Sequence, residues 1–367
     1  MIEWSEGHAS IRDAFRKFCE LEVKPKLHAI EHEGEPPYEV LRKMVATFGI
    51  ADMAKARFDK QIARQKEQSE AKEPRPPRTG PNPQAGMEMA MRMLPIIELS
   101  RYSVGMVTAL GVSMGLTANA IMSRGTVRQK ERWALSLLTL ETIGAWAITE
   151  PGSGSDAFGG MKSTARRDGD GYVLNGSKTF ITNGPYADTI VFICKLDEGN
   201  EPKLRKIVSF VLDKGMPGLT QSKPLRKLGL HGSPTGELFL DDVRVEKDRL
   251  LGETEEAPAR AEVKETFTAE RTAVAAMALG LIEECQRLSL DYASTREQFG
   301  KPIGEFQLIQ LKLATMEVAR MNVQNLVFRQ IEMAEQGKSM GIAEASACKL
   351  YCARAAMEVC HETVQLF

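Results

Sequence analysis

The chain has 367 residues, of which 43% are hydrophobic and 26% are charged, a composition typical of a soluble globular protein with two or three domains. Its 48 Lys and Arg residues nearly balance its 49 Asp and Glu residues, which argues against nucleic acid or an anionic membrane as a partner. We find no uninterrupted apolar run long enough to span a bilayer, and residues 1–6 do not resemble a secretory signal. We therefore expect a cytoplasmic protein, with a mature mitochondrial matrix form as the alternative.

The first part of the chain has the pattern of α-helices. Apolar residues recur every three or four positions near its start, at Ile11, Phe15 and Phe18. The segment from Met87 to Met122 is apolar and rich in Ala, Gly and Met, which is typical of a pair of buried helices. These features predict an N-terminal helical domain over residues 1–144.

A charged stretch over residues 54–86 interrupts this helical domain. Basic residues alternate with Gln and Glu in its first half, which allows a helix to continue, whereas the prolines of its second half exclude a regular helix. We interpret the stretch as a solvated excursion. The alternative is a binding patch, for example for nucleic acid, formed by the basic residues from Lys55 to Arg78.

Between residues 145 and 255 the pattern changes to short β-prone runs. Thr189–Cys194 and Ile207–Leu212 are two of these runs, and turn sequences such as Asn175-Gly176 separate them. Short strands with frequent turns predict an antiparallel β-barrel for this middle domain.

Long amphipathic patterns return after residue 260, over residues 261–294, 304–336 and 341–367. They predict an antiparallel helical bundle as a C-terminal domain over residues 256–367, so the fold is expected to be mainly α with a central β domain. The six cysteines are scattered without a Cys-x-x-Cys pair, which favours reduced core thiols. Cys348 and Cys352 share a helix face, but their Ala-rich surroundings favour helix packing over metal binding, and we expect no metal site.

A glycine-rich loop follows the first β-prone run. It belongs to the string Trp146-Ala147-Ile148-Thr149-Glu150-Pro151-Gly152-Ser153-Gly154-Ser155-Asp156. Gly152 and Gly154 allow positive φ and a close approach of the backbone to a ligand, and successive backbone N–H groups in such a loop form an anion site. The hydroxyls of Thr149, Ser153 and Ser155 can donate to a flavin ring or to a pyrophosphate.

This string resembles the flavin-binding signature of the acyl-CoA dehydrogenase family. Later segments resemble that family in the same order: Asn175–Asn183 is similar to its second flavin segment, Lys227–Val245 to the end of its β domain, and Arg296–Ile303 to a loop that binds the flavin of a neighbouring subunit. The resemblance covers most of the chain from Gly125 onward. It implies a helical domain, a β-barrel and a helical bundle in that order.

The resemblance implies FAD as the cofactor. Thr149 and Thr182 match residues that donate to the flavin ring, and Phe180 matches an aromatic residue, often Trp, that packs against it. Arg296 matches a residue that contacts the pyrophosphate. The complete set of implied cofactor-binding residues is Trp146, Ile148, Thr149, Ser155, Phe180, Thr182, Arg296, Phe299 and Gln365.

The implied reaction is the α,β-dehydrogenation of an acyl-CoA thioester to the trans-2-enoyl-CoA. In much of the family the catalytic carboxylate lies past a Gly-Gly-x-Gly motif, and this sequence stops at Phe367, where that motif is expected to begin, so we expect the bundle to be incomplete at its end. In members that resemble the isovaleryl and long-chain enzymes, the Glu lies on an earlier helix, directly before an Arg. Glu270 matches that position as the base and Arg271 as its neighbour; the alternative is ordinary surface charge.

The resemblance also implies an assembly and an electron acceptor. We expect a homotetramer, built as a dimer of dimers, that passes electrons to an electron-transferring flavoprotein in fatty acid or branched-chain acyl metabolism. One alternative is an acyl-CoA oxidase on the same fold. Another is a non-catalytic or half-site flavin-binding subunit of a hetero-oligomer.

Overall fold

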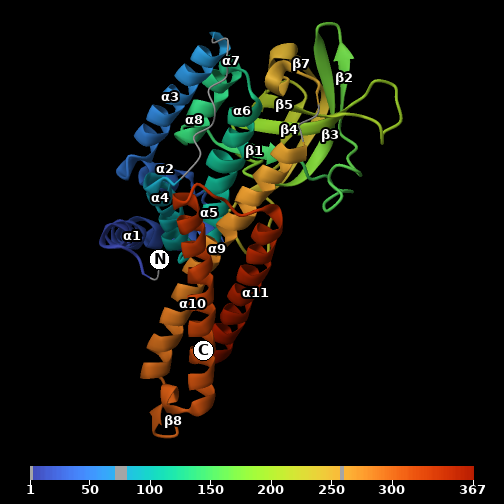
Figure 1. Cartoon of the computed structure of the whole chain (residues 1–367). Coiled ribbons are helices and arrows are strands. Elements are labelled where there is room, and N and C mark those ends of the chain that lie inside the picture. Colours follow the sequence, from blue (N-terminus) through green and yellow to red (C-terminus); the bar gives the residue numbers. More distant parts are fainter. Residues whose placement is uncertain (1–2, 71–80, 257–259) are drawn as a thin grey trace. The chain divides into compact units, whose positions relative to one another are not determined.

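The computed structural model describes residues 3–70, 81–256 and 260–367 (Figure 1). Contacts within the chain group it into two compact units. The bundle unit comprises Met1–Leu27, Pro77–Val107 and Arg260–Phe367, and the sheet unit comprises His28–Pro76 and Thr108–Ala259. The first helix of the chain therefore groups with the last ones, and the division into three domains at residues 144 and 255 stays a prediction.

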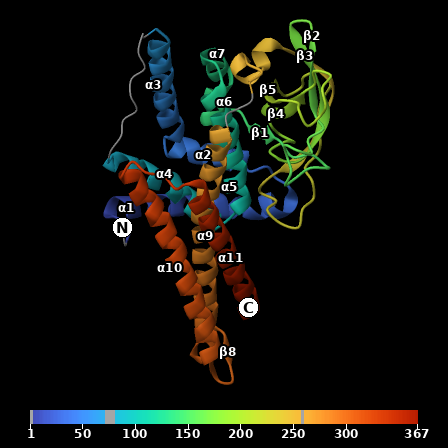
Figure 2. The same cartoon turned by 45° about the vertical axis from the view of Figure 1, so that its right-hand side comes forward.

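The bundle unit consists of long helices around one apolar core (Figure 2). Its principal helices are α1 (Glu6–Phe18), α4 (Pro83–Ser100), α9 (Arg260–Thr295), α10 (Gln307–Glu335) and α11 (Ile342–Leu366). Where α9 crosses α4, the backbones approach so closely that a Cβ on Gly280 would lie 2.0 Å from the carbonyl oxygen of Ile97. The three long helices predicted at the end of the chain are confirmed.

The helices of the sheet unit are at most 10 residues long, except for α3 (Ile50–Glu70), which has 21 residues. They are α2 (Tyr38–Thr47), α3, α6 (Ala118–Arg124), α7 (Val127–Gln129) and α8 (Leu135–Leu138), while α5 (Val104–Leu110) lies at the boundary of the two units. Phe58 and Ile62 of α3 pack with Trp133 and Leu137 in an apolar cluster. The first half of the charged stretch is therefore helical, as its pattern allows, and residues 71–80 of that stretch lie outside the described residues.

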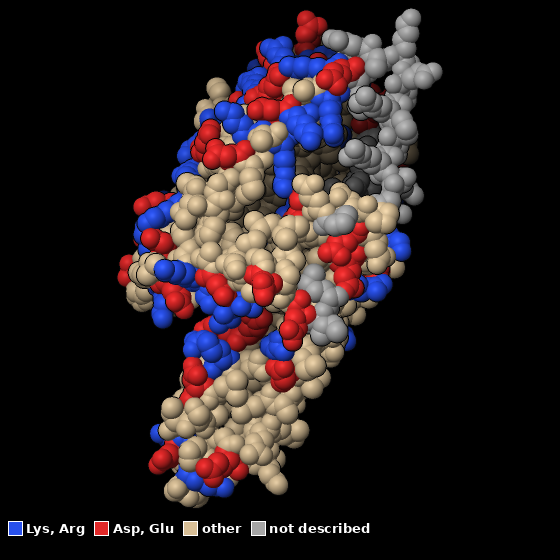
Figure 3. All heavy atoms as spheres, turned by 60° about the vertical axis from the view of Figure 1, so that its left-hand side comes forward, with Lys and Arg blue, Asp and Glu red and all other residues tan. Residues whose placement is uncertain are grey.

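The surface of α3 carries charges of both signs. Acidic and basic side chains are interspersed in the upper part of Figure 3, where α3 lies. Lys66 Nζ lies 2.8 Å from Glu131 Oε1, and Lys130 Nζ donates to Gln65 Oε1 at 2.7 Å. These contacts tie α3 to the helical turns that contain Lys130 and Glu131. Balanced charges with partners inside the unit favour the solvated interpretation of the stretch over a basic binding patch.

A curled sheet of seven strands forms the rest of the sheet unit. The strands are β1 (Gly144–Ala147), β2 (Thr164–Asp168), β3 (Gly171–Thr182), β4 (Thr189–Leu196), β5 (Ile207–Asp213), β6 (Leu219–Gln221) and β7 (Thr235–Glu246). Their order is β1-β4-β2-β3-β7-β6, with β5 paired to β4. The predicted central β domain is confirmed, although β1 and β2 run parallel to β4 rather than antiparallel. Local turn signals do not reveal these two pairings, because they join strands that are distant in sequence.

One helical stretch differs from the expectation that no segment of the chain is long and apolar enough to span a bilayer. From Val104 to Arg124 the chain is helical and, by length and composition, apolar enough to cross a bilayer. Core helices of globular proteins meet the same criteria, and Thr117, Ala118 and Ile121 of this stretch are buried within the protein. One such helix is weak evidence for a membrane span, and these buried residues fit a core helix.

Candidate functional site

An exposed aromatic ring lies on a bulge near the end of β3. The register between β3 and β7 slips after Lys178, so that Thr179 and Phe180 together oppose the single residue Glu237. Phe180 has a φ of 55° and is 69% exposed. A positive φ is uncommon for a bulky residue, and such strain is found preferentially at functional positions. The bulge thus directs a large apolar ring outward at the position predicted to contact a flavin.

The segment after β1 is fixed beside this bulge. The N–H of Thr179 donates to the carbonyl oxygen of Thr149 at 3.0 Å. Thr149 and Thr182 are half-buried, so both hydroxyl-bearing side chains keep part of their surface accessible. Trp146 is also half-buried, whereas Ile148 is buried in the core of the unit. The structure therefore brings together the two sequence segments that were predicted to contact a flavin ring.

A buried ion pair links the same two segments. Lys178 Nζ donates to Glu150 Oε1 at 2.8 Å and to the carbonyl oxygen of Ile148 at 3.1 Å, and the Lys178 and Glu150 side chains are 0% and 5% exposed. Glu150 also accepts the N–H groups of Lys162 and Ser163, at 2.6 and 3.0 Å. The carboxylate therefore holds the far end of the glycine-rich loop as well as β3.

Burial and hydrogen bonding oppose each other in this pair. Burial has the largest single effect on Glu150 and raises its pKa, but the hydrogen bonds from Lys178 and from Lys162 and Ser163 together outweigh burial, so the pKa stays below its ordinary value. For Lys178, burial prevails over the hydrogen bond to Glu150 and lowers the pKa. The fully buried lysine therefore bears the larger desolvation cost, while the carboxylate is held in its charged form.

The glycine-rich loop differs from the sequence prediction in two respects. Gly152 and Gly154 do not have positive φ; their Cα atoms instead border open space. Ser153 is turned inward, because its N–H donates to the carbonyl oxygen of Glu150 at 3.0 Å and its hydroxyl donates to the carbonyl oxygen of Asp156. Ser153 is therefore not a ligand donor, whereas Ser155 is exposed, as a donor must be.

Glu150 and Lys178 were not among the predicted site residues. The signal was present in the composition of β3, where Lys178 is the one charged residue of the strand. A lysine in an otherwise uncharged strand points to a buried partner, because an unpaired ammonium group is costly to bury.

The predicted base, Glu270, lies in the first part of α9 in the bundle unit. Its side chain is exposed, yet the protein around it raises the pKa of its carboxyl group by desolvation, against the opposing charge of Arg271. A carboxylate whose pKa is raised is better suited to remove a proton near neutral pH.

A hairpin with an aromatic tip follows the other end of α9. Its strands are β8 (Glu297–Gln298) and β9 (Lys301–Pro302), and its two turn residues, Phe299 and Gly300, have φ values of 53° and 79°. Two positive φ values define the turn that matches the twist of a hairpin, but they are unusual for Phe. The Phe299 side chain is 94% exposed. Arg296, also exposed, directly precedes the hairpin.

Gln365 lies at the same end of the bundle unit. Its neighbour Leu366 packs in a small apolar cluster with Ala293 of α9 and Ile303 of the segment after β9. Gln365 itself is exposed. The structure therefore brings Gln365 to the end of the bundle unit that carries Arg296 and the hairpin.

Glu270 and Arg296 are far apart. Both lie on or directly after the single helix α9, and at a rise of 1.5 Å per residue about 39 Å separates them along its axis. This distance exceeds the separation of the two ends of one dinucleotide. One chain therefore cannot place Glu270 near the flavin ring and Arg296 near the pyrophosphate of the same FAD molecule.

Two sequence models of one family match the chain. The acyl-CoA dehydrogenase middle domain matches residues 145–243, and the acyl-CoA dehydrogenase C-terminal domain matches residues 261–367. A curated relative, 3-(aryl)acrylate reductase of Clostridium sporogenes, is 32% identical over 365 residues, which are 99% of this chain and 88% of the relative.

Solved structures match along the whole chain. Butyryl-CoA dehydrogenase from Megasphaera elsdenii has a TM-score of 0.82 and 30% identity, and the match covers 100% of this chain and 89% of that one. A chain in a structure described as the electron transferring flavoprotein of Acidaminococcus fermentans has a TM-score of 0.79 and 30% identity, with the same coverage of both chains. The likeness therefore extends over both units rather than a single motif.

Proposed function

The chain belongs to the acyl-CoA dehydrogenase family, and we propose that it oxidises an acyl-CoA thioester with Glu270 as the base and an electron-transferring flavoprotein as the acceptor. Members of this family are FAD-dependent oxidoreductases, and acyl-CoA dehydrogenation in general follows from membership. The base, the acceptor and the assembly are what the proposal adds.

The residues of the sheet unit fit FAD. Phe180 offers an exposed ring on a strained bulge, the open space beside Gly152 and Gly154 admits a ligand close to the backbone, and Thr149 and Thr182 have partly accessible side chains. These residues would bind and orient the cofactor. FAD, when bound, supplies the acceptor for the hydride that leaves the β carbon of the substrate.

The proposal assigns removal of the α proton to Glu270. One observation carries this assignment: Glu270 directly precedes Arg271 in the first part of α9, the position of the base in family members whose catalytic Glu lies on an earlier helix. Desolvation, which raises the pKa of the Glu270 carboxyl group, is consistent with that role. The carboxylate accepts the α proton, and the electron pair of the broken C–H bond forms the Cα=Cβ double bond as the β hydride departs. Because only the ionised carboxylate can accept the proton, we expect the rate to rise with pH through the raised pKa.

We propose that a second copy of the chain covers the exposed apolar faces of α10 and α11. Leu350, Met357 and Val364 recur every seven residues on α11 and are 52%, 57% and 77% exposed. A stripe with this spacing is typical of a helix that packs against another helix. The long separation of Glu270 and Arg296 supports the same arrangement, since Arg296 and Phe299 would then serve the FAD of the second copy.

This assembly has a direct test in solution. We expect the wild-type protein to sediment as a dimer or tetramer, and Leu350→Lys with Val364→Lys to shift it toward monomer, because each lysine places a charge in the apolar contact. Lys349→Glu, an exposed change on the same helix outside the stripe, is the matched control. A monomeric wild-type protein that retains full activity would contradict the proposal.

We propose an electron-transferring flavoprotein as the acceptor because the resemblance to the family implies one. A structure described as such a flavoprotein also contains a chain that is 30% identical to this one. The relative described as a reductase catalyses the opposite direction of electron flow according to its name. The direction of the reaction is therefore part of the test.

The decisive experiment is an anaerobic titration of the FAD-loaded protein with short, branched and long acyl-CoAs, followed by flavin absorbance. We expect the wild type to lose its flavin absorbance, and Glu270→Gln to bind the same amount of FAD but react about 100- to 10,000-fold more slowly, the usual contribution of a general base. Glu305→Gln, an exposed glutamate after the hairpin, is the matched control and should react as the wild type does.

Three outcomes would contradict parts of this proposal. Equal bleaching by wild type and Glu270→Gln would assign the base elsewhere. FAD that binds but is bleached by no acyl-CoA would favour a non-catalytic subunit. Rapid reoxidation of the substrate-reduced protein by oxygen, without transfer to an electron-transferring flavoprotein, would indicate an oxidase.

A further inference from the structure

Two half-buried cysteines face each other between α9 and α11. Cys285 Sγ of α9 lies 3.8 Å from Cys360 Sγ of α11. All six cysteines of the chain lie in its described parts, and the other four, Cys19, Cys194, Cys348 and Cys352, are at most 3% exposed. Those four are core thiols, as predicted from the sequence, whereas Cys285 and Cys360 combine proximity with access to solvent.

The contact between the thiols belongs to a regular seam. One turn further along the same two helices, Ser289 Oγ donates to Thr363 Oγ1 at 3.3 Å, and beyond it the rings of Tyr292 and Phe367 stack at 4.4 Å. The sequence separation of the contacting residues stays at 74 or 75, so the helices run parallel and in register. Small side chains at the first two levels let the helix backbones approach closely.

The two sulfur atoms are near the distance at which a covalent bond forms. A disulfide has an S–S length of about 2.05 Å, so the sulfurs must close a gap of roughly 1.8 Å. Rotation about the Cα–Cβ bonds moves a sulfur atom by this much. We propose that Cys285 and Cys360 form an oxidisable dithiol, which a hydroperoxide converts into a disulfide between α9 and α11.

The surroundings assign different roles to the two thiols. The contact with the Cys360 thiol lowers the pKa of Cys285 to about 7, with burial opposing and the Thr363 hydroxyl assisting. The same contact and burial raise the pKa of Cys360. Cys285 is therefore the nucleophile at neutral pH, and Cys360 is the thiol that reacts second.

The chemistry balances in two steps. The Cys285 thiolate attacks one peroxide oxygen, so that an S–O bond forms, the O–O bond breaks, and the leaving oxygen takes a proton to become an alcohol or water. The Cys360 sulfur then attacks the sulfenic acid: the S–S bond forms, the S–O bond breaks, and water leaves with the proton of Cys360. Two thiols are oxidised and one hydroperoxide is reduced.

Peptide mapping tests this proposal directly. Trypsin places Cys285 on Thr272–Arg287, Cys348 on Ser339–Lys349, Cys352 on Leu350–Arg354 and Cys360 on the peptide that begins at Ala355. We expect hydrogen peroxide treatment of the FAD-loaded protein, followed by alkylation and digestion without reductant, to link the Cys285 and Cys360 peptides with loss of two hydrogens. Dithiothreitol should separate them again, and the Cys348 and Cys352 peptides should stay unlinked.

Single substitutions separate the two roles. Cys360→Ser should leave a sulfenic acid on Cys285 that dimedone captures, whereas Cys285→Ser should leave Cys360 reduced at the same peroxide concentration. In the wild type, alkylation of Cys285 should be half-maximal near pH 7. The disulfide should also raise the melting temperature, because it restricts the unfolded chain, and this rise should vanish in both variants.

Several results would overturn the proposal. They are the absence of a linked peptide at peroxide concentrations that oxidise exposed methionines, a preferred link between Cys348 and Cys352, and alkylation of Cys285 with the pH dependence of an ordinary cysteine. Equal dimedone capture on Cys360 in the Cys285→Ser variant would overturn the assigned order of reaction.

Discussion

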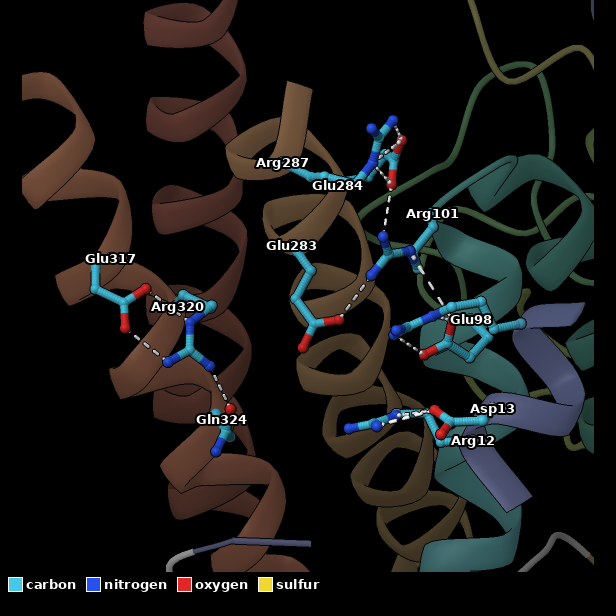
Figure 4. Close-up of polar contacts among 11 residues, drawn as sticks. Arg12, Asp13, Glu98, Arg101, Glu283, Glu284, Arg287, Glu317, Arg320 and Gln324 are labelled. Atoms are coloured by element: carbon cyan, nitrogen blue, oxygen red, sulfur yellow. Dashed lines mark hydrogen bonds and ion pairs between the residues drawn. The ribbon is translucent and has the colours of Figure 1, made fainter. Parts of the chain in front are cut away.

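The two units of the molecule bury carboxylates in different ways. In the sheet unit, Glu150 and Lys178 form a one-to-one pair that is almost completely shielded from water. In the bundle unit, Glu98 has a side chain that is 0% exposed, but two arginines share it (Figure 4). Arg16 binds Glu98 through two contacts of 2.9 Å and is 34% exposed. Arg101 contacts Glu98 at 3.9 Å and also binds Glu283 and Glu284, at 3.1 and 2.8 Å.

This difference predicts different tolerance to mutation. When a buried charge has one oppositely charged partner and no contact with water, removal of that partner leaves the charge uncompensated. The arginines around Glu98 have other carboxylates or solvent available. We infer that the sheet unit depends on its pair for the position of the glycine-rich loop, whereas the bundle unit distributes its charges over a network that can lose a member.

The largest effect is expected from Lys178→Met. It leaves the Glu150 carboxylate buried without a counter-ion, and breaking a buried pair in this way costs about 3–5 kcal/mol of unfolding free energy. We expect this loss in urea denaturation, together with weaker FAD retention, because the loop is no longer fixed to β3.

The double variant Lys178→Met/Glu150→Gln separates the charge from the packing. It removes both charges, so it should be more stable than Lys178→Met alone. A double variant that is less stable than either single one would contradict a role of Lys178 as the counter-ion. Arg244→Met, which breaks an exposed pair with Asp168, serves as the control and should change stability by less than about 1 kcal/mol.

Glu98→Gln should have an intermediate effect. The amide keeps the shape of the carboxylate and can still accept hydrogen bonds, while Arg16 reaches solvent and Arg101 keeps two carboxylates. We expect a loss of about 1–3 kcal/mol, the range for a charged hydrogen bond, measured by the same denaturation. A loss larger than that of Lys178→Met would reverse the comparison between the two units.

The smallest effect on stability is expected from lowering the pH. The folded state lowers the pKa of Glu150, so the pair contributes stability above the ordinary carboxyl value of 4.5 and loses it as the pH falls below that value toward the folded pKa. Lys178 stays protonated throughout this range. The stability difference between the wild type and the double variant should therefore narrow as the pH is lowered below 4.5, with the other carboxylates cancelling in the comparison. A constant difference would show that Glu150 does not titrate in this range.

The periodicity of the sequence was sufficient to predict the helices and the β domain, because helix and strand patterns are local. It was not sufficient for the parallel pairing of β1 and β2 with β4, which depends on contacts between distant segments. The bulge at Phe180 was equally hidden: Thr179-Phe180-Ile181 reads as ordinary strand, and only the register against β7 turns the ring outward.

The segments of the candidate site could be predicted from the sequence, but the directions of their side chains could not. Resemblance to a family indicated the segments at Thr149 and Phe180, and the structure brings these two segments together. It did not reveal that the Ser153 hydroxyl is used within the loop, or that Cys285 faces Cys360, since both depend on which way a side chain points.

The length of α9 has a consequence for how this protein can diverge. Its 36 residues form one rigid rod, with Glu270 near the beginning and Arg296 directly after the end. One inserted residue would rotate one end relative to the other by about 100° and move it about 1.5 Å, since the helix has 3.6 residues per turn. Substitutions do not change the direction in which one end of the helix faces relative to the other. An insertion preserves that direction only if the inserted residues add close to a whole number of helical turns. We therefore expect related chains to vary in the composition of this helix and to place their changes of length in the flanking loops.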